Sequence, residues 1–101
     1  MPKGYVILTE DIHDAAGMGE YAAASTPSII EHGARVLVVD ENVEVLEGGW
    51  HGTRTVIVEF DSVEAARAWY HSPSYQKAQP LRAAASTCNV AILSGFELPA
   101  R

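Results

Sequence analysis

Arg35 and Glu59 are the first pair of side chains in this sequence that could do chemistry together. They carry opposite charges and lie in two apolar segments, Arg35-Val-Leu-Val and Arg54-Thr-Val-Ile-Val-Glu-Phe60. By strand alternation both could point into the space between two subunits. Such a pair could orient a polar ligand, or it could be a structural ion pair that holds a dimer interface. Arg35 is therefore a candidate ligand-binding residue, and Glu59 is a candidate proton acceptor.

Trp50 and His51 form a second candidate site in the Gly-rich segment 48–52. A rigid aromatic ring could line the mouth of a pocket, and the pKa of an imidazole lies close enough to neutrality for proton transfer. Trp50 is thus a candidate ligand-binding residue and His51 a candidate catalytic residue. The alternative is a His exposed to solvent and a Trp packed on a partner subunit, since aromatic residues are enriched at interfaces.

Tyr75 and Arg82 are candidates for binding an anionic group, because a guanidinium and a phenol can both donate hydrogen bonds to it. Trp69 and Tyr70 precede them at helical positions and are better explained as core residues. Cys88 has no neighbouring motif for a lowered pKa and favours a packing role. The other histidines share no metal-ligand spacing with one another or with Cys88. We therefore expect no metal and no cofactor.

The elements that must position these residues can be read from periodicity, caps and breakers. Strands are predicted at 4–11, 34–39, 54–60 and 90–93, with a further extended segment at 43–46. One helix should run from an N-cap at Asp14 to Glu31 and end at Gly33, and Pro27 should cause a kink or short break near Ser25 and Thr26. A second should open on a capping box at Asp61 and Glu64, continue through Tyr70, restart at Pro73 and be bent or interrupted at Pro80 before ending near 86.

This order, βαββαβ, predicts an α+β fold of the ferredoxin-like kind, a four-stranded antiparallel sheet with the helices on one face. The strand at 54–60 places Val56, Val58 and Phe60 on the helix-covered face and Thr55, Ile57 and Glu59 on the other. In strand 34–39 the same alternation predicts Val36 and Val38 on the covered face, opposite Arg35, Leu37 and Val39. Because the second face is also largely apolar, we expect it to pack against a second subunit.

Size and charge limit the classes of function. The chain has 101 residues and a formal net charge of -6, and its seven Lys and Arg are scattered rather than clustered. Nucleic acid and membranes are therefore not expected partners. With one cysteine and only a short, interrupted apolar run near the N-terminus, the sequence favours a cytoplasmic protein. We expect a single domain over residues 1–101, with a core from about 4 to 95.

Four segments together resemble a bacterial family, the domain of unknown function 1330. The resemblance runs from Gly4 to about Gly95, and its most specific stretch, Trp69 to Tyr75, continues to Pro80-Leu81-Arg82. It implies a ferredoxin-like protomer that forms a dimeric α/β barrel, as in the group that resembles antibiotic-biosynthesis monooxygenases, and it implies no activity. The segments that carry it are Arg35-Val-Leu-Val, Glu44-Val-Leu-Glu-Gly48, Arg54-Thr-Val-Ile-Val-Glu-Phe60 and Ala65-Ala-Arg-Ala-Trp-Tyr-His-Ser-Pro-Ser-Tyr75.

Three functions remain open from the sequence. The first is a homodimeric small-molecule-binding domain of unassigned activity, with its pocket between sheet and helices near Arg35, Trp50, Glu59, Tyr75 and Arg82. The second is a cofactor-independent oxygenase or isomerase of the dimeric α/β-barrel superfamily, with His51 or Glu59 as the base. The third is a structural dimer without a ligand, in which Arg35 and Glu59 stabilise the interface.

Overall fold

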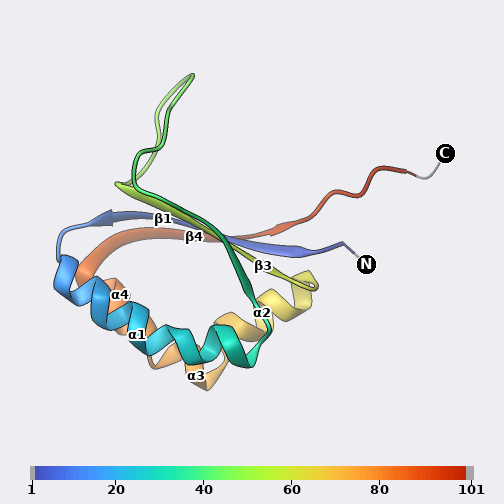
Figure 1. The fold of residues 1–101 in the computed structure, drawn as a ribbon, viewed down its shortest axis with the longest axis horizontal. Helices are drawn as coiled ribbons and strands as arrows, with labels where there is room; N and C mark the ends of the chain where they lie inside the picture. The colour runs from blue at the N-terminus through green and yellow to red at the C-terminus, as the bar shows by residue number, and fades with distance from the viewer. Residues whose placement is uncertain (1, 100–101) are drawn as a thin grey trace.

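The computed structural model describes residues 2–99, which form one antiparallel sheet with all helices on one side (Figure 1). The strands are β1 (Gly4–Ile12), β2 (Arg35–Asp40), β3 (Arg54–Phe60) and β4 (Ser86–Ser94), in the spatial order β2-β3-β1-β4. The helices are α1 (Ala15–Glu31), α2 (Val63–His71), α3 (Pro73–Gln76) and α4 (Gln79–Ala85). The predicted ferredoxin-like βαββαβ arrangement is confirmed.

Strand β1 lies in the middle of the sheet and sets the register of both neighbours. Tyr5 is opposite Glu59 on one side and Leu93 on the other. Alternate side chains of β1 and β3 therefore enter the core beneath the helices, where they are almost fully buried. The core contains Val6, Leu8, Val58 and Phe60 from the sheet and Met18, Tyr21, Ala66, Trp69, Tyr75, Ala78 and Ala85 from the helices.

Helix α1 begins and ends at the predicted signals. The Asp14 carboxylate accepts a hydrogen bond from the Gly17 amide at 3.1 Å, and Gly33 takes a φ of 62° just beyond the C-terminus. Pro27 lies inside the helix, yet the helix continues through it, so the predicted break is absent. The proline costs one backbone hydrogen bond, and it lies on the exposed side of the helix.

Serines, not aspartate, cap the helices of the second half. The cap of α2 is Ser62, whose hydroxyl accepts from the Ala65 amide at 3.0 Å, whereas Asp61 was predicted in this role. Ser72 ends α2 and caps α3, accepting from the Tyr75 amide at 3.2 Å. Strand β4 starts at Ser86, earlier than the predicted position 90.

A β-bulge in β2 reverses part of the predicted alternation. Val36 is opposite Val58, but Val38 is opposite Ile57 and Val39 opposite Val56, so Leu37 is the extra residue. Val39 consequently lies on the helix side and Val38 on the open side, the reverse of the prediction. All residues of β2 stay exposed in the single chain, with Val39 59% exposed.

Residues 41–53 form a long loop that extends away from the sheet on the side opposite the helices (Figure 1). The extended segment predicted at 43–46 is not a strand. The loop carries the exposed apolar side chains Val45, Leu46 and Trp50. Its end is held to β1, because the Thr53 amide donates to the Glu10 carbonyl oxygen at 2.7 Å.

Candidate functional site

A cavity of about 310 Å³ lies between α1 and the sheet. Its walls are mostly apolar, and the larger polar side chains that line it are those of Glu10, Tyr21 and Arg54. Small residues of α1, Ala22, Ser25 and Thr26, leave the space open on the helix side. The apolar walls come from Leu8, Ile29, Val36, Val39, Val56, Val58 and Trp69.

Glu10 and Arg54 form a buried ion pair at this cavity. They are opposite each other in the β1–β3 register, and Arg54 Nε donates to Glu10 Oε1 at 2.8 Å. The side chain of Glu10 is 1% exposed and that of Arg54 is 21% exposed. Removing two charges from water into a mostly apolar cavity can cost more free energy than their mutual attraction returns. This pair was missed by sequence reasoning.

The backbone around Glu10 leaves no room for a side chain at Gly52. Gly52 has a φ of 89°, and a Cβ there would lie 2.5 Å from the Glu10 carbonyl oxygen. Only glycine adopts this conformation readily and permits such a close approach. The end of the loop thus places Arg54 at the start of β3, directly across from Glu10.

A buried chain of hydrogen bonds leads away from the cavity. The hydroxyls of Tyr21 and Tyr75 are 2.9 Å apart, and Arg82 Nε donates to the Tyr75 hydroxyl at 3.3 Å. Burial and the neighbouring Tyr75 raise the pKa of Tyr21, so it stays protonated at neutral pH. The two predicted residues Tyr75 and Arg82 therefore meet in the core.

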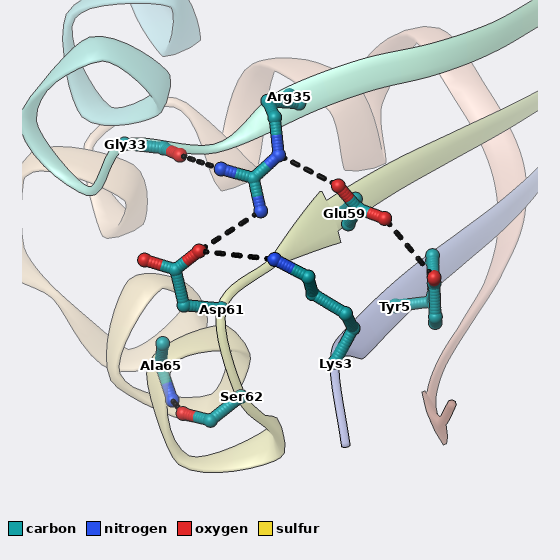
Figure 2. Close-up of polar contacts among 8 residues, drawn as sticks. All are labelled: Lys3, Tyr5, Gly33, Arg35, Glu59, Asp61, Ser62 and Ala65. Carbon is teal, nitrogen blue, oxygen red and sulfur yellow. Dashed lines mark hydrogen bonds and ion pairs between the residues drawn. The ribbon is translucent and has the colours of Figure 1, made fainter. Parts of the chain in front are cut away.

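Arg35 and Glu59 do pair, on the open face of the sheet (Figure 2). Arg35 Nε donates to Glu59 Oε1 at 2.6 Å, and the Tyr5 hydroxyl donates to the other carboxylate oxygen at 3.0 Å. The remaining guanidinium nitrogens bind Asp61 at 3.0 Å and the Gly33 carbonyl oxygen at 3.2 Å. A ligand at Arg35 would have to replace these partners, and its ligand-binding role stays a prediction.

The hydrogen bonds of this network shift the titration of its members. The Arg35 guanidinium, followed by the Tyr5 hydroxyl, lowers the pKa of Glu59. Arg35 also lowers the pKa of Asp61, with Lys3 assisting at 3.6 Å. The hydrogen bond to the Glu59 carboxylate raises the pKa of Tyr5. All these groups are ionised in their usual way at neutral pH, so Glu59 is a weaker base than an isolated glutamate.

Acid should destabilise the fold through this network. Because the pKa values of Glu59 and Asp61 are lowered by folding, the unfolded chain binds more protons in mild acid. Their stabilisation is complete above the unfolded values, about 4, and is lost as the pH falls through the lower folded values. We expect the Tm of Glu59→Gln to fall less steeply than that of the wild type between about pH 5 and about pH 3. The control Glu20→Gln alters an exposed carboxylate on α1, and equal slopes in all three proteins would contradict the prediction.

Trp50 and His51 fold back onto the open face of the sheet. Trp50 Nε1 donates to Thr55 Oγ1 at 2.8 Å, and His51 Nδ1 lies 2.9 Å from Thr9 Oγ1. His51 contacts Thr9 and Glu59 contacts Tyr5, two positions four residues and about 13 Å apart along β1. The structure thus does not bring the two predicted catalytic residues together, and neither lines the cavity beneath α1.

Other chemistry is sparse in the described part of the chain. Within residues 2–99, no group of three or more His, Cys, Asp and Glu side chains could hold a metal ion. No helix over the same residues is long and apolar enough to cross a membrane. A cytoplasmic location stays a prediction.

Comparison with known protein families shows to which family the chain belongs. The family described as domain of unknown function (DUF1330) matches residues 3–96. The chain belongs to the DUF1330 family. The relationship predicted from the four sequence segments is thereby confirmed, and no curated protein matches the chain.

Solved structures share the fold of this DUF1330 chain at low sequence identity. The RPA0582 protein of unknown function from Rhodopseudomonas palustris is 19% identical with a TM-score of 0.79, covering 96% of this chain and 85% of its own. A dimeric ferredoxin-like protein of unknown function from Jannaschia sp. CCS1 is 16% identical with a TM-score of 0.68, covering 90% and 97%. SnoaB, a cofactor-independent oxygenase from Streptomyces nogalater, is 12% identical with a TM-score of 0.65, covering 97% of each chain. These similarities establish the fold alone.

Proposed function

We propose that this protein is a homodimeric small-molecule-binding protein whose ligand occupies the cavity beneath α1. The observation that supports it is the buried Glu10–Arg54 pair at the wall of a mostly apolar cavity. Binding sites commonly have this composition, with apolar walls and a few polar groups that fix orientation. The predicted location between sheet and helices is retained, with a different set of residues.

The cavity favours a compact ligand with an apolar body and one polar group. Its volume of about 310 Å³ lies at the lower end for small-molecule sites. At the polar end the ligand would meet a guanidinium that donates hydrogen bonds and a carboxylate that accepts them. A hydroxyl or carbonyl group satisfies this combination without adding a charge to the cavity.

Tyr21 would add a third contact at the polar end. Hydrogen bonds that run in one direction strengthen one another, which favours donation from Arg82 to Tyr75 and from Tyr75 to Tyr21. The Tyr21 hydroxyl hydrogen is then free to donate to a ligand oxygen. The buried chain in this way orients a donor in the cavity.

Dimerisation through the open face of the sheet is the second part of the proposal. This face carries Ile7, Val38, Ile57 and Leu93 along neighbouring strands, and Val38 and Leu93 are exposed in the single chain. Apolar side chains in this number favour burial against another copy. Solved proteins of the same fold that are described as dimeric support this assembly.

Blocking the cavity tests the proposal. We expect a thermal-shift screen of a metabolite library to find compounds that raise the Tm of the wild type. A ligand present at 100 times its Kd stabilises the folded state by about 2.7 kcal/mol. Ala22→Trp places an indole where Ala22 lines the cavity, and Ala23→Trp adds the same indole at an exposed neighbouring position of α1. Hits should disappear in Ala22→Trp and persist in Ala23→Trp. An absence of hits, or hits that survive in Ala22→Trp, would overturn the proposal.

Acid–base catalysis is a second candidate, because the cavity contains a carboxylate. Glu10 could remove a proton from a carbon acid bound beside Arg54, leaving a carbanion stabilised by the guanidinium and a protonated Glu10. An isomerase or cofactor-independent oxygenase would use such a step. Consumption of an enolisable aromatic compound by the wild type and its abolition in Glu10→Gln would support it, and an unchanged rate would exclude Glu10 as the base.

A further inference from the structure

Arg82 is a buried cation without an acidic partner. It lies on α4, is 5% exposed, and forms no ion pair with any carboxylate among residues 2–99. Its Nε donates to a neutral phenol, that of Tyr75. An unpaired buried guanidinium is expensive, so a protein that retains one commonly supplies a counterion from elsewhere.

The free nitrogens of Arg82 open onto a cleft. Across the described residues no fully buried polar side-chain atom lacks a hydrogen-bond partner, and Nε is the Arg82 nitrogen for which a partner is found. The two Nη atoms therefore reach accessible space. Arg82 lines a cleft of about 460 Å³ between α4, α2 and β4, together with Tyr70, Gln79, Ala83, Thr87, Cys88 and Val90.

We propose that this cleft binds the carboxylate of a small molecule, with Arg82 as the recognition residue. The planar Nη fork matches a carboxylate in a bidentate manner. Arg82 is the cation among the residues that line the cleft, which suits one negative charge better than a phosphate dianion. Gln79 and Thr87 supply neutral donors, and Tyr70 and Val90 supply apolar surface for the rest of the ligand.

Cys88 does not provide the missing counterion. Burial raises the pKa of its thiol, against the opposing effect of Arg82, so the thiol is neutral at pH 7. Its sulfur hydrogen bonds to the Asn89 carbonyl oxygen at 3.6 Å. The cleft also has no acidic residue in its lining, and Glu10, opposite Cys88 in the β1–β4 register, is already paired with Arg54, which leaves an anion from solution as the proposed partner.

Titration with sodium benzoate, followed by NMR at constant ionic strength, tests the site. We expect saturable shifts of the Arg82 Nε–Hε signal and of the Gln79 and Thr87 amides in the wild type. Binding should weaken at least about tenfold in Arg82→Gln, the loss of one charge-assisted contact. It should persist in Arg67→Gln, which removes an exposed arginine of α2. Absence of saturable binding at these signals, or equal binding by Arg82→Gln, would overturn the proposal.

A pair of variants keeps the test valid if Arg82→Gln does not fold. Ala83→Glu adds a carboxylate to the rim of the cleft while retaining Arg82, and Ala83→Gln is its uncharged counterpart. Benzoate binding should be lost in Ala83→Glu and kept in Ala83→Gln, and equal binding by both would contradict the site. Sodium phosphate that binds more tightly than benzoate would overturn the preference for a carboxylate. Ala22→Trp, which closes the other cavity, should leave cleft binding unchanged, so the two proposals fail separately.

Discussion

Replacement of Arg54 by Ala is expected to lower the free energy of unfolding by about 3–5 kcal/mol. Glu10 is 1% exposed, and its carboxylate would then lie in an apolar cavity without the guanidinium that accompanies it. The cost is dominated by the buried charge that remains, because the ion pair itself contributes much less than its removal destroys. Chemical denaturation at neutral pH measures the change.

Two variants separate charge burial from the loss of side-chain packing. Arg67→Ala removes an exposed arginine from α2 and should change stability by less than about 0.5 kcal/mol. The double variant Glu10→Leu with Arg54→Leu removes both charges and should recover most of the stability lost in Arg54→Ala. It should also lose any ligand that depends on the polar end of the cavity. An Arg54→Ala protein as stable as the wild type would mean that the pair is not desolvated in solution.

Substitution of Ile57 by Glu is expected to dissociate the proposed dimer. Ile57 lies on the open face in the middle of β3, opposite Ile7 on β1 and Val38 on β2. Each subunit would bring one unpaired carboxylate into the interface, where desolvation and the repulsion of like charges both oppose association. The dissociation constant should rise by a factor on the order of 100 or more, which corresponds to about 2.7 kcal/mol. Analytical ultracentrifugation over a concentration series measures it.

The matched control places the same charge on the opposite side of the molecule. Ala68→Glu lies on the exposed surface of α2, which the proposed interface does not use. It should leave the dimer intact, and circular dichroism should show that both variants are folded. If Ile57→Glu remains dimeric at the concentrations at which the wild type is dimeric, the interface must lie on another surface.

The fold could be predicted from sequence because its signals are local and agree with one another. The alternation in 54–60, the Asp14 cap and the stop at Gly33 each specify an element on their own. The bulge at Leu37 could not be predicted in the same way, because no glycine or proline marks it. Its presence depends on pairing with β3, which is a tertiary property.

The candidate site was predicted only in part. The Arg35–Glu59 pair was anticipated from strand alternation, and the structure contains it. Glu10 was missed because Thr9, Glu10 and Asp11 look like the polar end of a strand. The sequence does contain a signal for it. Glu10 is two residues after Leu8 and four after Val6, so strand alternation places all three side chains on the face beneath the helices. An acidic residue that alternation places on the core-facing side of a strand indicates a buried charge, even at the end of the strand.

The two tryptophans of the chain occupy unlike surroundings, and this gives the protein two separate optical reporters. Trp69 is buried, donates to Ser28 at 3.0 Å, and has its ring centre 4.1 Å from that of Tyr75. Its emission should be blue-shifted and sensitive to events in the cavity that it lines. Trp50 is 51% exposed at the base of the long loop, and its emission should follow contact with another subunit. Ligand entry and subunit association should thus act on two different intrinsic fluorophores, without any added label.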